Sequence, residues 1–264
     1  MKKEKILVNI ENLDFIDKYK EIGINNFLFA IEDFSIGYKT FNIDDLINLR
    51  CNKFLLLNRI LNCNEVDELK KLIDKIKLFD GIIFEDLSIY NIFKGYDIKL
   101  IWNQTHFATN YNSINFWLDR VDSVVISNEL TISELIEILN NTNNRLVLNV
   151  FGKNPVMYSR RTLLSNFNKN FNLDNYDNVI LSEPITNNEF NAIENKFGSI
   201  LFNNTFFNII PFLNEIDDNI IKYYLIYPHG LNSDEILEYL KGERDNTNDG
   251  FLNKKTIYKL GERI

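Results

Sequence analysis

Residues 123–167 read SVVISNELTISELIEILNNTNNRLVLNVFGKNPVMYSRRTLLSNF, and this stretch decides the fold class. Two apolar runs, Val124–Ile126 and Leu146–Val150, each end in polar residues and enclose a segment with helical periodicity. Thr131 at the start of that segment is followed three residues later by Glu134, which is the spacing of a capping box. The stretch therefore predicts a strand, a helix and a second strand, with polar tips where a ligand would bind.

The same unit repeats along the chain. Short apolar runs alternate with amphipathic segments, as parallel strands and their covering helices do. The runs are Ile6–Ile10, Phe27–Ile31, Phe54–Leu57, Gly81–Phe84, Ile98–Trp102, Val124–Ile126, Leu146–Val150 and Tyr223–Tyr227. Such a repeat over 264 residues predicts an α/β fold, a (β/α)8 barrel of the TIM type. An open doubly wound sheet is the alternative, but no glycine-rich phosphate-binding motif follows any of these runs.

The C-terminal part predicts an addition to the barrel. Residues 168–178 are rich in Asn and Asp, which is typical of a surface loop. Val179–Leu181 and Ile200–Phe202 have the composition of strands, and we expect them to form a small β insertion within residues 168–205. We expect residues 1–264 to form a single barrel domain that carries this insertion.

The composition limits the class of protein. Hydrophobic residues make up 45% of the chain and charged residues 25%, as in soluble globular proteins. The net charge of −8 argues against a broad nucleic-acid or anionic-membrane surface, although a local basic patch is compatible with it. No apolar run approaches the ~18 residues of a membrane span, and the run after the N-terminal lysines is too short for a secretory signal. We expect a cytoplasmic protein without a membrane partner.

Cysteine is sparse. Cys51 and Cys63 are the only two, and they do not form a C-x-x-C pair. This pattern predicts neither a disulfide framework nor a four-cysteine metal or cluster site. We expect both cysteines to be small, buried, apolar side chains.

Polar residues follow strand after strand, and parallel α/β proteins bind ligands at the C-terminal ends of their strands. The set comprises Asn9, Glu11, Glu32, Asp33, Asn58, Arg59, Glu85, Asp86, Asn103, His106, Ser127, Asn128, Glu129 and Tyr158–Arg161. A turn or a helix cap explains any one of them equally well. The repetition of charged pairs at successive strand ends favours a binding site.

Four side chains are candidates for acid–base chemistry. Glu85 or Asp86 with Glu129 is the best pair of carboxylates to share the acid and base roles across a pocket. Helix capping, or pairing with the arginines downstream, is the alternative for each. His106 lies just beyond a strand end and is a candidate acid–base group or metal ligand. No second histidine is near it in sequence, so we expect no metal site. His229 is flanked by proline and glycine, which indicates a turn.

Two arginines are candidates for substrate binding. Arg160 and Arg161 follow Tyr158, and paired guanidinium groups can hold a carboxylate or phosphate through two hydrogen bonds each. Salt bridges from these arginines to the acidic strand ends are an equally good explanation.

Several segments together carry a family resemblance. They are Asp80–Leu87, Thr109–Asn110 with Ser113, Val124–Leu130, Val150–Gly152, Met157–Arg161 and, near the end, Gly250–Leu252 with Lys255–Tyr258. In these segments the chain resembles the collagenase-like peptidases of peptidase family U32. The resemblance implies a peptidase of undefined catalytic type. It also points to relatives that hold an iron–sulfur cluster and support hydroxylation of RNA or of a quinone precursor.

The chain departs from the family pattern where the cluster-bearing relatives have their ligands. Their usual segment has a histidine before the glycine and cysteines after it, whereas this chain has Phe151 before Gly152, with Pro155 and Thr162 at the expected cysteine positions. None of these side chains ligates iron. We therefore expect no iron–sulfur cluster, and the residues indicate no other cofactor.

Two functions are compatible with these observations. The first is a hydrolase acting on a peptide or small-molecule substrate at the strand ends. Its catalytic residues are Glu85, Glu129 and His106, and its substrate-binding residues are Asp86, Asn103, Asn110, Asn128, Tyr158, Arg160 and Arg161. The alternative is a non-proteolytic barrel that binds a small ligand, RNA or a partner subunit and assists a hydroxylation-type modification performed elsewhere. A scaffold without activity also remains compatible with the loss of the cysteines.

Overall fold

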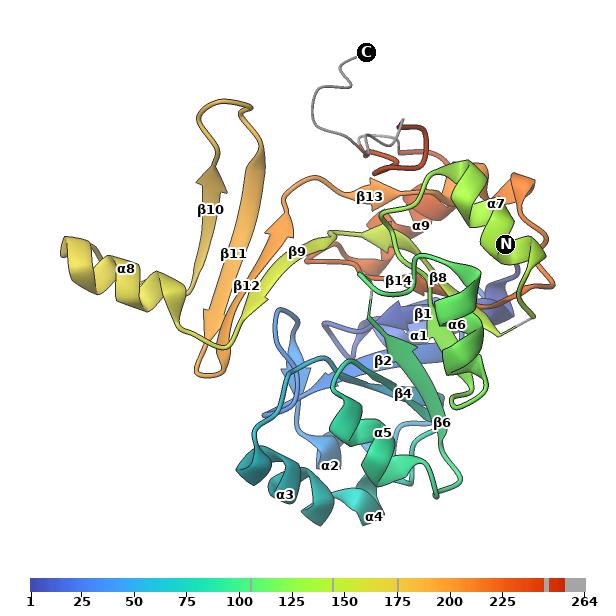
Figure 1. Ribbon diagram of the computed structural model, residues 1–264, viewed down its shortest axis with the longest axis horizontal. Helices are drawn as coiled ribbons and strands as arrows, with labels where there is room; N and C mark the ends of the chain where they lie inside the picture. The colour runs from blue at the N-terminus through green and yellow to red at the C-terminus, as the bar shows by residue number, and fades with distance from the viewer. Residues whose placement is uncertain (105, 144, 175, 245–246, 255–264) are drawn as a thin grey trace.

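Eight parallel strands form a closed barrel in the computed structural model, which describes residues 1–104, 106–143, 145–174, 176–244 and 247–254 (Figure 1). They are β1 (Ile6–Asn9), β2 (Asn26–Ile31), β4 (Asn52–Leu57), β5 (Gly81–Phe84), β6 (Lys99–Asn103), β7 (Ser123–Val125), β8 (Leu146–Gly152) and β14 (Ile221–Ile226). β1 closes the barrel by pairing with β2 on one side and β14 on the other. The predicted (β/α)8 barrel is confirmed, and the Lys255–Tyr258 motif lies outside the described residues.

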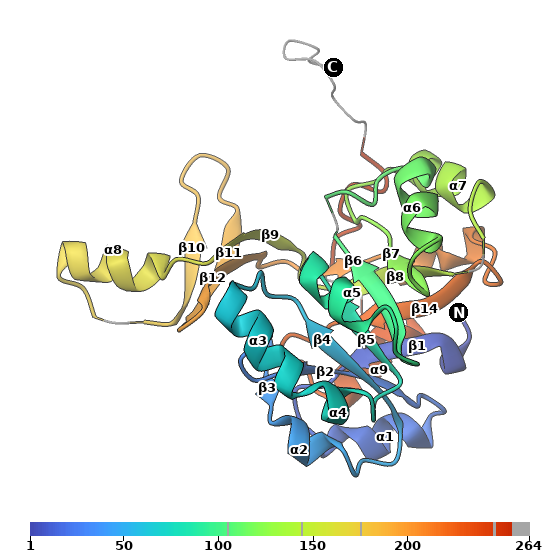
Figure 2. The same cartoon turned by 60° about the horizontal axis from the view of Figure 1, so that its bottom comes forward.

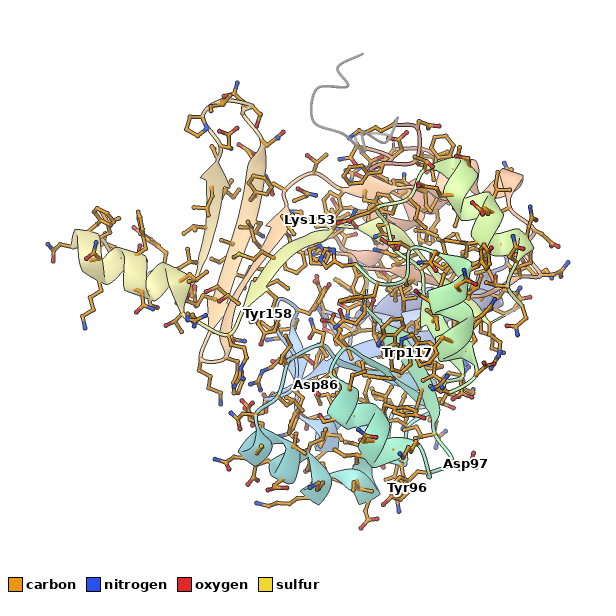
Figure 3. All side chains as sticks on the ribbon, viewed as in Figure 1. Asp86, Tyr96, Asp97, Trp117, Lys153 and Tyr158 are labelled. Carbon is orange, nitrogen blue, oxygen red and sulfur yellow. The ribbon has the colours of Figure 1, made fainter. Side chains whose placement is uncertain are left out.

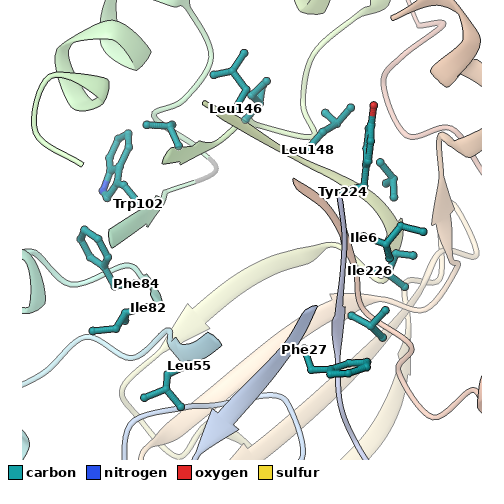
Figure 4. Packing of buried hydrophobic residues seen from close by; sticks show 14 of the residues in the cluster. Ile6, Phe27, Leu55, Ile82, Phe84, Trp102, Leu146, Leu148, Tyr224 and Ile226 are labelled. Carbon is teal, nitrogen blue, oxygen red and sulfur yellow. The ribbon is translucent and has the colours of Figure 1, made fainter. Parts of the chain in front are cut away.

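Alternation along each strand explains why the strands are apolar throughout. One set of side chains points into the barrel. Phe54 on β4 and Tyr223 on β14 have ring centroids 5.3 Å apart, although their strands are not neighbours in the sheet. The other set faces the helices, as Figure 4 shows for Leu55, Ile82, Phe84 and Trp102. Both faces of the sheet are buried, so each strand has little need of polar residues.

Helices cover the barrel between most strands (Figure 2). They are α1 (Phe15–Glu21), α2 (Ile43–Leu46), α3 (Cys63–Lys71), α4 (Ile73–Ile76), α5 (Leu87–Phe93), α6 (Tyr111–Leu118), α7 (Ile132–Asn140) and α9 (Ser233–Lys241). Short elements complete the barrel: η1 (Lys3–Lys5), β3 (Thr40–Phe41), β13 (Phe207–Asn208) and η2 (Ile210–Glu215). The capping box expected at Thr131 and Glu134 begins α7. In the described chain, none of the helices combines the length and apolarity that crossing a bilayer requires.

The predicted β insertion is confirmed, and we call it the arm. It consists of β9 (Pro155–Ser159), α8 (Leu163–Phe171), β10 (Asn178–Ser182), β11 (Glu189–Asn195) and β12 (Gly198–Asn203). Its strands form an antiparallel sheet in the order β10-β11-β12-β9, which projects from one side of the barrel in Figures 1 and 2. β9 lies upstream of the 168–205 segment, so Tyr158–Arg161 belong to the arm and not to the end of a barrel strand.

Charged and aromatic contacts hold the arm against the barrel. The buried Arg59 guanidinium, which follows β4, lies 3.5 Å from the centroid of the Phe197 ring at the turn between β11 and β12. Lys196 in the same turn forms a 2.8 Å ion pair with Asp33. Because Phe202 also packs beside the β2–β3 connection, β9 and β12 reach over the mouth of the barrel.

Candidate active site

The C-terminal ends of the strands surround a cavity of about 350 Å³, which we call the mouth cavity. Barrel strand ends contribute Asn58, Glu85, Asn103, Asn128, Asn149 and Tyr227, and the arm contributes residues 155–158 and Ile200. Figure 3 shows Lys153 and Tyr158 on the side of the barrel mouth that faces the arm. The cavity is therefore built from the barrel and the arm together.

Glu85 follows β5 and presents a carboxyl group to this cavity. Its backbone is fixed on both sides, since its N–H donates to Leu57 at 3.3 Å and its carbonyl accepts from the Gln104 side chain at 3.2 Å. Burial raises the pKa of the Glu85 carboxyl to about 8. Within the described chain, no hydrogen bond or ion pair reaches this carboxyl. At neutral pH it is mostly protonated, so it can act as a proton donor.

His106 and Glu129 meet at the rim. The His106 Nδ1 atom lies 3.4 Å from Glu129 Oε1, and the two side chains are 58% and 53% exposed. His106 and Glu85 both line the mouth cavity, whereas Glu129 contacts His106 and does not line the cavity. A carboxylate near Nδ1 favours the imidazole tautomer that carries its proton on that atom, which leaves Nε2 free to accept a proton. The structure thus brings together the three residues predicted to be catalytic.

Three polar atoms in the cavity wall have no partner. The amide oxygens of Asn103 and Asn149 and the hydroxyl of Tyr158 are buried, and each lacks a hydrogen bond from the described residues. Burial raises the pKa of Tyr158, and the nearby Arg59 lowers it, although no hydrogen bond of good geometry joins the two side chains. Buried polar atoms of this kind are ordinarily satisfied by water or a ligand. They mark this wall as the place where a polar ligand would bind.

Aromatic rings close the side of the cavity nearest the arm. Tyr38 stacks on Tyr227 with centroids 4.9 Å apart, and His229 packs against Tyr38 at 5.5 Å and Phe202 at 5.0 Å. Burial, aided by the charge of Lys153, lowers the pKa of His229 to about 3, so the ring stays neutral. His229 occupies the predicted turn with a φ of 48°. Burial raises the pKa of Tyr227, and the Glu85 carboxyl adds to this effect, so the phenol also stays neutral.

Four of the predicted binding residues do not line the mouth cavity. The Asp86 carboxylate caps α5 through the Ser88 N–H at 2.8 Å, and the Asn110 side chain caps α6. Arg160 lies 3.9 Å from Glu65, and Arg161 is exposed. For Asp86 and Asn110 the structure shows the capping role that was the alternative, whereas Arg160 approaches Glu65 of α3 and not an acidic strand end. A role in substrate binding remains a prediction for all four.

Asn103, Asn128 and Tyr158 do line the cavity, as predicted for binding residues. The cavity is also lined by Tyr38, Asn149, Lys153 and Tyr227, which were not predicted as site residues. The sequence could have marked Asn149 as a site residue, because it is a polar residue within an otherwise apolar strand that is buried on both faces. Tyr38 is brought to the cavity only by the path of the β2–β3 connection, so no local pattern marks it.

The two cysteines do not fit the iron–sulfur cluster that the relatives suggest, because such clusters need four cysteine thiolates or their histidine replacements. Cys51 lies just before the first residue of β4, whereas Cys63 begins α3, beyond the last residue of β4. The six residues of β4 separate the two ends of this strand by about 20 Å. Cys63 is exposed and Cys51 half-buried, so the expectation that both are buried is wrong. Cys63 stands in the first turn of a surface helix, which leaves it open to solvent. The described residues also contain no group of three or more His, Cys, Asp or Glu placed to hold a metal ion.

Comparison with known proteins identifies the family. The sequence model of Peptidase family U32 matches residues 29–177, which is more than half of the chain. The chain belongs to peptidase family U32. The matched region runs from β2 into the arm and includes the mouth-cavity residues Glu85, His106 and Tyr158. The resemblance proposed from the sequence motifs is confirmed.

Two solved structures that this U32 family member resembles are only about 10% identical to it in sequence. A chitinase from Chromobacterium violaceum is 10% identical with a TM-score of 0.43, and the match covers 90% of this chain and 98% of that one. The spore cortex-lytic enzyme SleL from Bacillus megaterium is 9% identical with a TM-score of 0.42, covering 96% of this chain and 75% of that one. No curated protein matches the sequence.

Proposed function

We propose that this U32 family member is a hydrolase that acts on a peptide or small polar substrate in the mouth cavity. The observation that carries the proposal is the Glu85 carboxyl, whose pKa burial raises to about 8 at the end of a barrel strand. A pKa near the working pH is what an acid–base catalyst needs. His106, paired with Glu129 on the same rim, is the matching base.

The proposed reaction uses both groups on opposite sides of the scissile bond. His106 takes a proton from water through Nε2, and the water oxygen adds to the substrate carbonyl carbon. Glu85 gives its proton to the leaving nitrogen as the C–N bond breaks. The proton on His106 then returns to Glu85 through solvent, and both groups regain their starting states. Glu129 fixes the imidazole and does not contact the substrate.

The cavity sets the scale of the substrate. Its volume of about 350 Å³ lies at the lower end of the range for small-molecule sites. The free oxygens of Asn103 and Asn149 can accept hydrogen bonds from substrate N–H or O–H groups. A few residues of an extended peptide, or a small polar molecule, meet these limits better than a folded protein does.

Hydrolysis assays test the proposal directly. Purified protein is incubated with a fluorogenic peptide library and with gelatin, with and without added divalent metals. Glu85→Gln and His106→Asn should each lower the rate by about 100-fold or more, while Lys222→Gln, an exposed side chain at the opposite end of the barrel, should retain it. Absence of cleavage by the wild type, or full activity in Glu85→Gln, would overturn the proposal.

The non-hydrolytic alternative rests on the same unpartnered atoms of Asn103, Asn149 and Tyr158. They support ligand binding whether or not a reaction follows. In that case the barrel holds a ligand, and a separate enzyme performs the modification. Comparing a deletion strain with its parent by RNA nucleoside mass spectrometry and by peptide turnover separates the two functions. A changed nucleoside with unchanged peptide turnover would favour the alternative.

A further inference from the structure

A second hollow of about 610 Å³ lies beside the mouth cavity, between α5 and α6, and we call it the apolar groove. Glu85 and Gln104 line both the mouth cavity and this groove, so the two spaces adjoin at these residues. The groove is further lined by Leu87, Trp102, Phe107, Asn112, Phe116 and Trp117. Anything bound in the mouth cavity therefore has a large apolar space next to it.

Two stacked indoles line the groove. The rings of Trp102 and Trp117 have centroids 4.4 Å apart and are inclined by 23°, and Trp117 belongs to α6 (Figure 3). Trp102 is only 4% exposed, and its indole N–H has no hydrogen-bond partner in the described chain. A buried donor without a partner is rare, and a bound ligand with an acceptor atom would satisfy it.

The rim of the groove exposes large apolar side chains. Leu87 is 53% exposed, Phe107 66% and Phe116 52%. Completing the burial of such a side chain stabilises a complex by about 1–2 kcal/mol, a fraction of the value for full burial. Exposed aromatic residues around a hollow that adjoins a candidate catalytic carboxyl are typical of a binding site.

We propose that the apolar groove binds an aromatic or bulky aliphatic group of the substrate, next to the bond on which Glu85 acts. The position of the bond rests on the proposed function, whereas the preference for an apolar group rests on the groove alone. A ligand of this class would cover Phe107 and Phe116 and rest on the indole stack. Its polar part would extend into the mouth cavity toward Asn103 and Asn149.

The chain itself supplies the reporter for a test. Its only two tryptophans are Trp102 and Trp117, so intrinsic fluorescence reports on the groove. The probe is N-acetyl-4-nitrophenylalanyl-alanine amide, whose nitrophenyl ring quenches indole emission. The control compound is N-acetyl-alanyl-alanine amide, which has a methyl group in place of the large aromatic side chain. Titrations use wild type and Glu85→Gln, because binding can then be measured without hydrolysis. We expect saturable quenching by the nitrophenyl probe, and an excess of the alanyl compound, which carries no quencher, should not reverse it by competition.

Two variants make the test specific. Phe107→Ser should weaken probe binding by about 10-fold, the equivalent of about 1.4 kcal/mol of lost apolar contact. Leu78→Ser removes a side chain of similar exposure (57%) that precedes β5 at the opposite end of the barrel, and should have no effect. Quenching that does not saturate, or that is equal in Phe107→Ser and wild type, would overturn the proposal. Saturable binding without cleavage would instead support the groove as a binding site and would contradict only the proposed hydrolytic function.

The arm carries a separate observation. Leu163, Phe167 and Phe171 follow one stripe of α8 at helical spacing, yet they are 39%, 55% and 58% exposed. Leu173 and Tyr176, each 54% exposed, extend this surface toward Ile180 on β10, which is 58% exposed. Figures 1 and 2 show α8 projecting away from the barrel in both views. No described element covers this apolar face.

β10 adds an unprotected sheet edge. It is the terminal strand of the arm sheet, and its sequence, Asn178–Ser182, contains neither a charge nor a proline. Natural edge strands ordinarily carry such residues, because a bare edge pairs readily with another strand. When a strand pairs antiparallel with the same strand of a second copy, the two copies are related by a two-fold axis, and the assembly stops at a dimer.

We infer that two copies of this chain associate through their arms, with β10 of one copy antiparallel to β10 of the other. The apolar stripe of α8 and the residues beside it would flank the joined sheets. Half-exposed aromatic and aliphatic side chains offer about 100 Å² each, so these six supply about 600 Å² of the ~800 Å² per partner of a stable interface, and the paired β10 strands add the rest. A second copy is the favoured occupant because the edge is complementary to itself.

Sedimentation velocity between about 1 and 100 μM tests the association. We expect a concentration-dependent dimer for the wild type and a monomer for Ile180→Lys, with circular dichroism confirming that the variant is folded. Ile185→Lys is the matched control, since Ile185 is 90% exposed in the turn beyond β10 and should leave the dimer intact. A wild type that is monomeric throughout, or a dimer that survives Ile180→Lys, would overturn the inference.

Discussion

Glu85 and Asp86 are adjacent in sequence, but their carboxyl groups have opposite environments. Asp86 accepts hydrogen bonds from the backbone N–H groups of Ser88 and Leu61, each at 2.8 Å, whereas Glu85 faces the mouth cavity without a partner. The change of direction at the end of β5 produces the difference. An unpaired buried acid destabilises the fold when it ionises, so the property that suits Glu85 for proton transfer is also a cost to stability.

We expect Glu85→Gln to stabilise the protein relative to the wild type as the pH rises. Burial raises the pKa of Glu85 to about 8, from 4.5 for an ordinary glutamate. The folded state favours the protonated form, so this contribution to stability is complete below pH 4.5 and is lost as the pH rises through 8. Urea unfolding at about pH 5 and pH 9 should show the variant gaining about 2–4 kcal/mol on the wild type over this interval.

Glu183→Gln is the matched control for this experiment. Hydrogen bonds from the Thr186 side chain and from the backbone of Ile185 and Thr186 lower the pKa of Glu183, so it titrates below the interval. Its difference from the wild type should be the same at both pH values. A pH-independent effect of Glu85→Gln would show that the carboxyl is not buried and unpaired as described.

The elements show where sequence patterns succeed and where they fail. The eight barrel strands were predictable because burial on both faces makes each one a continuous apolar run. β9 was not, because Pro155–Met157 are exposed and the strand pairs with β12, far along the chain. The same non-local pairing moves Tyr158 from a predicted strand end into the arm, yet still places it at the cavity. The positions of Glu85 and His106 at the cavity were predictable because both follow barrel strands, Glu85 directly and His106 three residues after β6, whereas their catalytic roles remain predictions.

We expect the stability of α8 to depend on Glu194 of β11. The Glu194 carboxylate accepts hydrogen bonds from the N–H of Leu164 at 2.7 Å and of Ser165 at 3.0 Å, and from the Ser199 hydroxyl at 2.6 Å. Burial alone would raise its pKa, but these bonds hold the pKa below the usual range. Glu194→Gln should lower hydrogen-exchange protection in residues 163–171 by about 10-fold, equivalent to about 1.4 kcal/mol for a lost cap.

Acidification should act in the same direction as this substitution. Because the folded-state pKa of Glu194 is depressed, its contribution is present above the ordinary glutamate pKa and is lost as the pH falls through the folded value. Glu189→Gln is the control on the same strand, since Glu189 is exposed and, among the described residues, its carboxylate accepts a hydrogen bond only from the Asn204 side chain. Unchanged exchange of α8 in Glu194→Gln would contradict the capping role.

At the scale of the whole molecule, function depends on the junction between barrel and arm. The eightfold repeat indicated the barrel, but no periodicity indicated that the arm would form a wall of the mouth cavity. That contact depends on Arg59 lying over Phe197 and on Phe202 packing beside Tyr38, with ring centroids 5.7 Å apart. Residues so distant in sequence leave no local pattern. The cavity residues at the barrel strand ends could therefore be predicted from the sequence, whereas those contributed by the arm could not.

Gly37 lies at this junction, and we expect Gly37→Ala to loosen the arm from the barrel. Its φ of +82° is strained for any residue with a Cβ, and a Cβ there would lie 2.8 Å from the Phe202 ring. The substitution should cost about 1–3 kcal/mol, which lowers Tm by several degrees and exposes the β11–β12 turn to proteolysis. Gly95→Ala is the matched control, because a Cβ at Gly95 meets nothing within 4 Å. Equal Tm values for the two variants would mean that the arm does not depend on this contact, and the mouth cavity would then lack its fixed wall.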